Sequence, residues 1–228
     1  MGCGRIHDPS APESWRQQHP TAICVTYINS SAEVKSISDV IITSSNAAQI
    51  VESIPKDREI LFGPDQHLGR WLSQKLNRPF HLWPGACEVH VLFNAKRLFE
   101  LIQKHPDAVV IAHPECDQSV LQYATVVGST SRLLDEVKNN PARKFIVATE
   151  TGILHQMQKM SPDKTFIPAP PNNNCACNDC PHMKLNTLEK VYLALRYEIP
   201  EITMDEELRI AAKKPIDLML KISKQYGL

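Results

Sequence analysis

Short apolar runs alternate along the chain with polar turns and predicted helices. The run from Ala22 to Ile28 is rich in strand-forming residues and leads to a polar turn, and Ile60 to Phe62 is a second short run of this kind. The same succession of strand, turn, helix and strand returns later, with strands predicted at Ala108 to Ala112 and at Phe145 to Ala148. Alternation of strands and helices predicts parallel α/β units, whose ligand sites lie at the carboxyl ends of the strands.

The two halves of this pattern are copies of each other. The stretch from Gln17 to Leu72 aligns without a gap on the stretch from Gln103 to Gln158, at an offset of 86 positions. A repeat of this length predicts two domains of one fold, each a three-layer α/β domain with a short parallel sheet. The predicted division is 1–16 for a residual N-terminal segment, 17–86 for copy one, 87–170 for copy two, and 171–228 for a cysteine loop and C-terminal helices.

Two helices are predicted after the cysteine loop. Asn186 and Thr187 form a predicted N-cap for the first, LEKVYLALRYE. The segment from Thr203 to Glu206 has the pattern of a capping box ahead of the second, LRIAAKKPIDLMLKIS. Because Pro215 lies inside this second segment, we expect it to break or kink the helix.

Composition places the chain among ordinary globular proteins, with 43% hydrophobic and 22% charged residues. The formal net charge is zero and Lys and Arg do not cluster, which argues against binding to nucleic acid or to an anionic membrane and favours small-molecule partners. The sequence has no apolar run near the roughly 20 residues of a membrane span and begins without the apolar core of a signal peptide. The cytoplasm is therefore the predicted location.

Seven cysteines, an odd number, favour metal binding or buried thiols over disulfides in a reducing compartment. Three of them, Cys175, Cys177 and Cys180, lie in one loop from Asn172 to Met183. Thiolates suit zinc or iron–sulfur clusters, and a cysteine followed by proline, as at Cys180, is common in cluster loops. A zinc knuckle would need a second pair of cysteines spaced like Cys177 and Cys180, which the sequence lacks. A surface thiol cluster is the remaining alternative.

The other cysteines differ in their surroundings. Cys87 follows a glycine and alanine in the linker between the two copies and has His90 close behind it, so it is a candidate metal ligand. Cys24 lies inside an apolar strand and is predicted to be core. Cys116 follows Glu115 at a strand tip, where we expect it to support the site without binding metal.

Polar residues follow the predicted strands of both copies. The tips carry Tyr27, Asn29, Ser44 and Asp65 in copy one, and His113, Glu115, Thr130 and Glu150 in copy two. Each has a structural alternative, since Ser and Thr cap helices and Asn favours turns. We expect Asp65 and Glu150 to be structural.

The segments around these residues resemble the successive signatures of quinolinate synthase of the bacterial A type. In chain order they are VTYINSSAEVKSISDVIITSSN, PGACEVH, VIAHPEC, VGSTS, FIVATETGILHQM, FIPAPPNNNCACNDCPHMKLNTLEK and PEITMDEELR. The resemblance implies an enzyme that condenses iminoaspartate with dihydroxyacetone phosphate to quinolinate, phosphate and water in NAD biosynthesis. It also implies a functional link to L-aspartate oxidase or aspartate dehydrogenase, which would supply the iminoaspartate.

The same resemblance implies a [4Fe–4S] cluster held by three cysteines, with one iron left open as a Lewis acid. Cys87 and Cys180 match two of the ligands, and Cys3 is the candidate for the third. Cys175 and Cys177 match additional loop cysteines.

The resemblance further assigns roles to the residues at the strand tips. Glu115 is the expected general base, and His113 the residue that binds substrate oxygens or relays the proton. Tyr27 and Asn29 would orient the intermediate. Ser44 and Thr130, each expected to open a helix, would bind phosphate or carboxylate, and His90 is expected to point into the same cavity.

The family has three similar α/β domains around one site, and the repeat supplies two of them. The sequence therefore predicts that most of the first domain is absent and that the C-terminal helices, which would pack on it, expose an apolar stripe. Two alternatives stay open: a truncated, inactive remnant that binds a cluster or ligand, and a zinc-binding scaffold.

Overall fold

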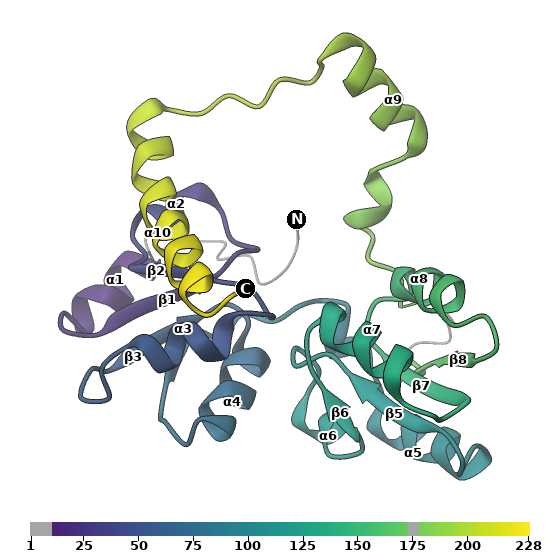
Figure 1. Ribbon diagram of the computed structural model, residues 1–228. Helices are drawn as coiled ribbons and strands as arrows, with labels where there is room; N and C mark the ends of the chain where they lie inside the picture. The colour runs from purple at the N-terminus through teal and green to yellow at the C-terminus, as the bar shows by residue number, and fades with distance from the viewer. Residues whose placement is uncertain (1–10, 173–177) are drawn as a thin grey trace.

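A computed structural model describes residues 11–172 and 178–228 of the chain. It contains two separate four-stranded parallel sheets with helices packed around them, as Figure 1 shows. The two sheets have the same strand order, β2-β1-β3-β4 and β6-β5-β7-β8. The predicted pair of repeated α/β domains is thus confirmed.

Copy one is built on the first sheet. Its strands are β1 (Ile23–Tyr27), β2 (Val40–Ile42), β3 (Ile60–Gly63) and β4 (His81–Leu82). Its helices are α1 (Ala11–Gln18), α2 (Ala32–Ser36), α3 (Ala47–Ser53) and α4 (Gln66–Lys75). The core of this copy joins β-branched strand residues such as Val25 and Ile41 to Ile50 of α3 and Leu72 of α4.

Copy two repeats this arrangement. Its strands are β5 (Val109–Ala112), β6 (Val126–Val127), β7 (Lys144–Ala148) and β8 (Thr165–Pro168). Its helices are α5 (Ala95–Lys104), α6 (Gln118–Leu121), α7 (Thr130–Asn139) and α8 (Gly152–Met160), and a short 3₁₀ helix, η1 (His90–Leu92), precedes α5.

The strands of copy two separate its core into two faces. Ile146 and Ala148 pack in one apolar cluster with Leu98 of α5, while Phe145 and Val147 pack in another with Leu133 of α7. Successive residues of a strand point to opposite faces of the sheet, so this alternation places helices on both sides. Copy two therefore has the predicted three layers.

Strand pairing corrects one detail of the predicted repeat. Ile23 of β1 pairs with Ile60 of β3, and the equivalent Val109 of β5 pairs with Phe145 of β7. The third strand of copy two thus begins one residue earlier than an unbroken offset requires, and the alignment is not free of gaps. The offset is restored at the following helices, which begin at Gln66 and Gly152.

The C-terminal segment contains a 3₁₀ helix, η2 (Met183–Leu185), and two α-helices, α9 (Leu188–Tyr197) and α10 (Glu206–Gln225). Thr187 caps α9 as predicted, its side chain accepting a hydrogen bond from the Lys190 N–H. The predicted capping box at Thr203 is wrong, because Asp205 is the N-cap of α10. The predicted break at Pro215 is also wrong, since α10 continues through it.

Helix α10 packs on copy one, against α2, β2 and α3, as Figure 1 shows. Ala212, Pro215 and Met219 are buried by this contact. The expectation that both C-terminal helices expose apolar residues is confirmed in part for α10, which buries one face on copy one but leaves Ile210 47% and Leu220 57% exposed. It is confirmed for α9, on which Leu188 is 86% exposed and Leu195 is 80% exposed.

Among the described residues, no helix combines the length and apolar character that crossing a membrane requires.

Candidate functional site

One cavity of about 700 Å³ lies where the two copies and the cysteine loop meet. It is lined by nine of the residues singled out from the sequence, Tyr27, Asn29, Cys87, His90, His113, Glu115, Thr130, Glu150 and Cys180. Ser44 is not among the described residues that line this cavity. Cys3, Cys175 and Cys177 lie outside the described residues.

Within each copy, the residues that line this cavity lie at one edge of the sheet because the strands are parallel. Tyr27 is the last residue of β1, His113 directly follows β5, and Thr149 directly follows β7. Thr130 is the first residue of α7, where Ser129 forms the N-cap by accepting a hydrogen bond from the Arg132 N–H. The carboxyl ends of parallel strands and the amino ends of the helices after them share one edge of a sheet, which is where ligands bind in such folds.

Ser44 differs from Thr130 in its surroundings. It lies in the turn between β2 and α3, and Asn46 is the N-cap of α3. The expectation that Ser44 opens a helix is wrong. The turn residues Thr43 to Asn46 hold themselves together instead, since the Thr43 N–H donates to the Asn46 side-chain oxygen at 2.7 Å.

A buried ion pair forms the centre of the site. His90 Nδ1 lies 2.9 Å from Glu115 Oε2, and both side chains are less than 10% exposed. The other ring nitrogen of His90, Nε2, is hydrogen-bonded to the Thr149 hydroxyl at 3.1 Å. His113 stacks on His90 with ring centroids 4.8 Å apart, and its Nδ1 lies 3.7 Å from the same Glu115 oxygen.

This pairing sets the charges of the three groups. Burial by itself lowers the pKa of His90, but its hydrogen bonds to Cys87 and Glu115 and the charges of both groups outweigh burial and raise that pKa. Burial raises the pKa of Glu115, and the opposing effects of His90, His113 and Tyr27 bring it below its usual range. Burial lowers the pKa of His113 to about 4. At neutral pH the site therefore holds an imidazolium at His90, a carboxylate at Glu115 and a neutral imidazole at His113.

Cys87 completes this group. Its thiol, the His90 ring and the Glu115 carboxylate offer ligand atoms within 4.8 Å of one another, and all three residues are buried. A neighbouring imidazolium stabilises a thiolate, the form of cysteine that binds metal. Cys180 lines the same cavity, so the donor set fits a thiolate-bound metal group shared by two distant segments.

The two cysteine segments are also joined by an ion pair that the sequence analysis missed. His182 Nε2 lies 2.8 Å from Glu88 Oε1, which brings the residue after Cys87 to the cysteine loop. Thr149, the partner of His90, was missed as well. Its position directly after a predicted strand was a signal that could have identified it, whereas the pairing of Glu88 with His182 has no local sequence signal.

The remaining candidates lie beside the cavity or in the core. Cys24 and Cys116 are buried, Cys24 in β1 and Cys116 with its thiol 3.3 Å from the Ala148 carbonyl oxygen. Asp65 caps α4 by accepting hydrogen bonds from the N–H groups of His67 and Leu68. Burial and the charge of Glu115 raise the pKa of Asp65 to about 7, against the backbone N–H groups that favour the carboxylate.

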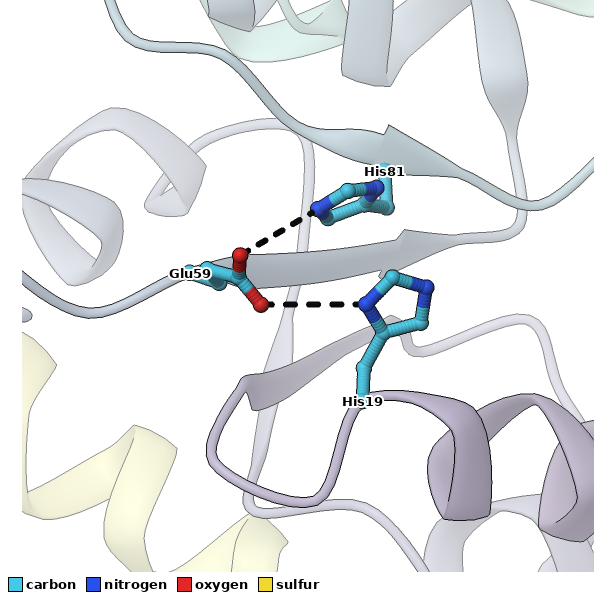
Figure 2. Close-up of side chains that lie close together, drawn as sticks. All are labelled: His19, Glu59 and His81. Atoms are coloured by element: carbon cyan, nitrogen blue, oxygen red, sulfur yellow. Dashed lines mark ion pairs between the residues drawn. The ribbon is translucent and has the colours of Figure 1, made fainter.

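A second group of possible ligands lies at the opposite edge of the first sheet. His19 Nδ1 and His81 Nε2 approach the Glu59 carboxylate at 3.7 and 4.0 Å, as Figure 2 shows. These residues precede or begin strands, and the side chains of Glu59 and His81 are about half exposed. The group in the cavity is better placed for function, because it is buried and lies at the carboxyl ends of the strands.

The sequence of the chain is similar to one family of known proteins. The family model described as quinolinate synthetase A protein matches residues 5–221. Quinolinate synthase of Nostoc punctiforme is 53% identical over 94% of this chain and 66% of its own length. The enzymes of Rippkaea orientalis and Chloroherpeton thalassium are 52% and 51% identical, over 97% and 98% of this chain and 69% and 70% of theirs. The chain thus spans about two thirds of the length of these curated relatives. It belongs to the quinolinate synthetase A family.

Proposed function

We propose that the protein acts as a quinolinate synthase, condensing iminoaspartate with dihydroxyacetone phosphate to quinolinate, phosphate and water. The observation that carries the proposal is the convergence of Cys87 and Cys180 with the buried His90–Glu115 pair in one cavity. The similarity to proteins named quinolinate synthase supports it. A cytoplasmic location, where thiols stay reduced, and a supply of iminoaspartate by an aspartate oxidase or dehydrogenase are parts of the same proposal.

Cys87 and Cys180 would hold a [4Fe–4S] cluster, with Cys3 as the third ligand. When bound by three cysteines, such a cluster supplies an open iron that acts as a Lewis acid toward a substrate hydroxyl or carboxylate. The depth of Cys87, which is 9% exposed, suits a group that must be shielded from water.

Glu115 and its histidine neighbours would move protons. The Glu115 carboxylate is ionised and lines the cavity, so it can accept a proton from a bound substrate. The low pKa makes Glu115 a weak base by itself. The His90 imidazolium at 2.9 Å keeps Glu115 ionised, whereas the neutral His113 ring can accept a proton or form a hydrogen bond with substrate.

Other cavity residues would bind and orient the substrates. Tyr27 and Asn29 present a phenol and an amide from the end of β1. Thr130 and Ser131 line the cavity at the amino end of α7, whose backbone N–H groups and dipole favour a phosphate or carboxylate. We propose this end of α7 as the position of the anionic end of a substrate. Ser44, outside the lining, has no role in this proposal.

Anaerobic reconstitution of the 228-residue chain with iron and sulfide tests the proposal. We expect Mössbauer spectra of a [4Fe–4S] cluster and quinolinate formation from the two substrates. In Glu115→Gln, turnover should be lost with the cluster content unchanged, and loss of the cluster would instead assign Glu115 a structural role.

The same experiment separates the alternatives. A chain that takes up the cluster without turnover is a cluster-binding remnant. The Cys87–His90–Glu115 group also has the mixed ligands of a mononuclear zinc site. Uptake of zinc with no charge-transfer absorption after reconstitution would support that scaffold and overturn the proposed cofactor.

A further inference from the structure

The backbone on either side of Cys87 is held by two hydrogen bonds to the tip of copy one. The Cys87 N–H donates to Asp65 Oδ2 at 2.6 Å. In return, the N–H of the next residue along the tip, Gln66, donates to the Gly85 carbonyl oxygen at 2.8 Å. The Asp65 carboxylate and the Gln66 N–H therefore hold both ends of the segment from Gly85 to Cys87.

The cysteine loop is held by the same pattern on copy two. The Cys180 N–H donates to Glu150 Oε1 at 3.3 Å. The N–H of Thr151, the residue after Glu150, donates to the Asn178 carbonyl oxygen at 3.4 Å. The accepting carbonyl again lies two residues before the cysteine.

Asp65 and Glu150 each lie two residues after the third strand of their copy, which ends at Gly63 in copy one and at Ala148 in copy two. Each follows the third strand of its copy and precedes the next helix, α4 or α8. Each uses its other contacts to hold that helix, since Asp65 Oδ1 accepts from the N–H groups of His67 and Leu68, and Glu150 Oε2 accepts from the Gly152 N–H. The inter-domain linker and the cysteine loop are unrelated in sequence. Each is nevertheless held by the same pair of hydrogen bonds to the segment after the third strand of its copy.

We propose that Asp65 and Glu150 are positioning residues, which fix the backbones of Cys87 and Cys180 so that both thiols face the shared cavity. A carboxylate holds a backbone N–H more firmly than a neutral oxygen does, and ligands held in place before metal arrives bind it more tightly. The nature of the bound group rests on the proposed function. The positioning of the two cysteines is independent of it.

The hydrogen bonds that hold Cys87 and Cys180 differ in strength. Asp65 is 1% exposed and its bond to Cys87 is short, whereas the bond from Cys180 to Glu150 is longer and Glu150 is half-buried. Cys87 should therefore be held more rigidly than Cys180.

Three variants separate positioning from helix capping. Asp65→Ser keeps a good N-cap for α4 but has no second oxygen for the Cys87 N–H. Glu150→Gln keeps the size of the side chain but replaces one of the two accepting oxygens by an NH₂ group. Asp205→Asn is the matched control, because Asp205 caps α10 by accepting from the Leu208 N–H and lies far along the chain from the cysteines.

Hydrogen exchange of the metal-free chain is the first measurement. We expect the Cys87 amide to exchange about tenfold faster or more in Asp65→Ser, and the Cys180 amide to do so by a smaller factor in Glu150→Gln, because each variant removes the carboxyl group that accepts from the amide. Amides in the middle of α4 and α8, and both cysteine amides in Asp205→Asn, should exchange at wild-type rates. Unchanged cysteine amides, or acceleration spread over the whole of α4, would overturn the inference.

Loss of the reconstituted cluster to a chelator, followed anaerobically by absorbance, is the second measurement. Both variants should lose the cluster severalfold faster than wild type and Asp205→Asn, with Asp65→Ser the faster. Equal rates would contradict positioning of the ligands. A wild-type chain that takes up no cluster would overturn the proposed cofactor alone, because the exchange rates of the metal-free chain still decide the inference.

Discussion

Asn46 and Ser223 are joined by a buried hydrogen bond of 3.0 Å, donated by the Asn46 side-chain nitrogen to the Ser223 hydroxyl oxygen. The two residues are 177 positions apart, one at the N-cap of α3 and the other near the end of α10. The Asn46 side-chain oxygen is used at the same time by the Thr43 N–H. Helix α10 is therefore held on copy one by a buried hydrogen bond as well as by its apolar residues.

Ser223→Ala should therefore destabilise the protein by about 1–3 kcal/mol, because the Asn46 NH₂ group stays buried without its acceptor. Denaturant unfolding measures this change in the free energy of unfolding. Lys221→Ala, on the exposed side of the same helix, is the control and should change it by less than about 0.5 kcal/mol. Equal effects of the two substitutions would show that α10 leaves copy one readily.

Gly63 and Trp83 form a close contact that the repeat explains. A Cβ at Gly63 would lie 2.3 Å from the Trp83 Cβ. In copy two the equivalent positions are Ala148 and Ala169, and the same backbone hydrogen bond joins β8 to β7 as joins Trp83 to Phe62. Copy one thus has a glycine, which has no side chain, opposite a large tryptophan, where copy two has two alanines.

Gly63→Ala should cost about 1–3 kcal/mol through overpacking. In a Trp83→Gly background, which removes the Trp83 Cβ that the new methyl group would meet, the same change should cost much less. Unfolding of both single variants and the double variant gives the coupling free energy. Additive effects would mean that Trp83 moves aside without cost.

Much of this fold could be predicted because its signals are local. The apolar runs, the strand tips and the Thr187 cap each depend on a few neighbouring residues, and the repeat added the topology. The two-residue strand β4 was not predicted, since His81 and Leu82 are too few to show a period. Pairings between distant segments, such as Glu88 with His182 or α10 with copy one, depend on the tertiary arrangement.

The same limit applies to the site. Tyr27, His113, Glu115 and Thr130 were predicted at strand tips from the local pattern, and the family resemblance implied one shared site for both copies. All four line one cavity. Asp65 and Glu150 were expected to be structural, and Asp65 does cap α4. Their second hydrogen bond, to a cysteine that follows much later in the chain, has no sequence signal.

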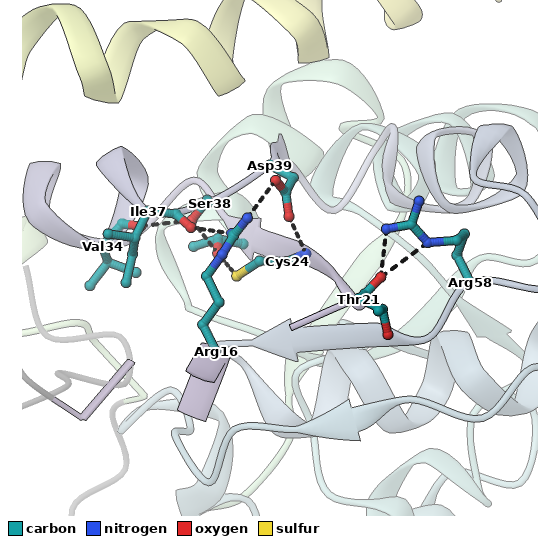
Figure 3. Close-up of polar contacts among 9 residues, drawn as sticks. Arg16, Thr21, Cys24, Val34, Ile37, Ser38, Asp39 and Arg58 are labelled. Carbon is teal, nitrogen blue, oxygen red and sulfur yellow. Dashed lines mark hydrogen bonds and ion pairs between the residues drawn. The ribbon is translucent and has the colours of Figure 1, made fainter. Parts of the chain in front are cut away.

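Asp39 is another carboxylate that joins two segments of the chain, as Figure 3 shows. It accepts hydrogen bonds from Arg16 of α1 and from the Cys24 N–H of β1, both at 2.8 Å. The Arg16 and Asp39 side chains are 36% and 34% exposed, so their ion pair should contribute less than about 1 kcal/mol. Arg16→Ala should then be nearly silent in unfolding, while Asp39→Ala should cost about 1–2 kcal/mol, because it also leaves the Cys24 N–H without its acceptor. Equal costs would place the stabilisation in the ion pair.

The His90–Glu115 pair should behave as one unit in the metal-free protein. His90→Gln removes the positive charge closest to a carboxylate that is almost fully buried, and a buried pair broken on one side costs about 3–5 kcal/mol. Glu115→Gln should cost less, since a neutral amide is easier to bury and can still accept from the His90 ring.

The double variant decides whether the two residues act together. Once Glu115 is Gln, changing His90 leaves no uncompensated charge at that position, so His90→Gln should cost at least about 1.5 kcal/mol less in that background than in wild type. Urea unfolding of the four proteins without metal gives this difference.

His113, whose Nδ1 lies 3.7 Å from the same carboxylate, tests whether the coupling to Glu115 is specific to His90. Because burial keeps His113 neutral, His113→Gln should couple to Glu115→Gln much more weakly, and equal coupling would show that the charge is shared between both histidines.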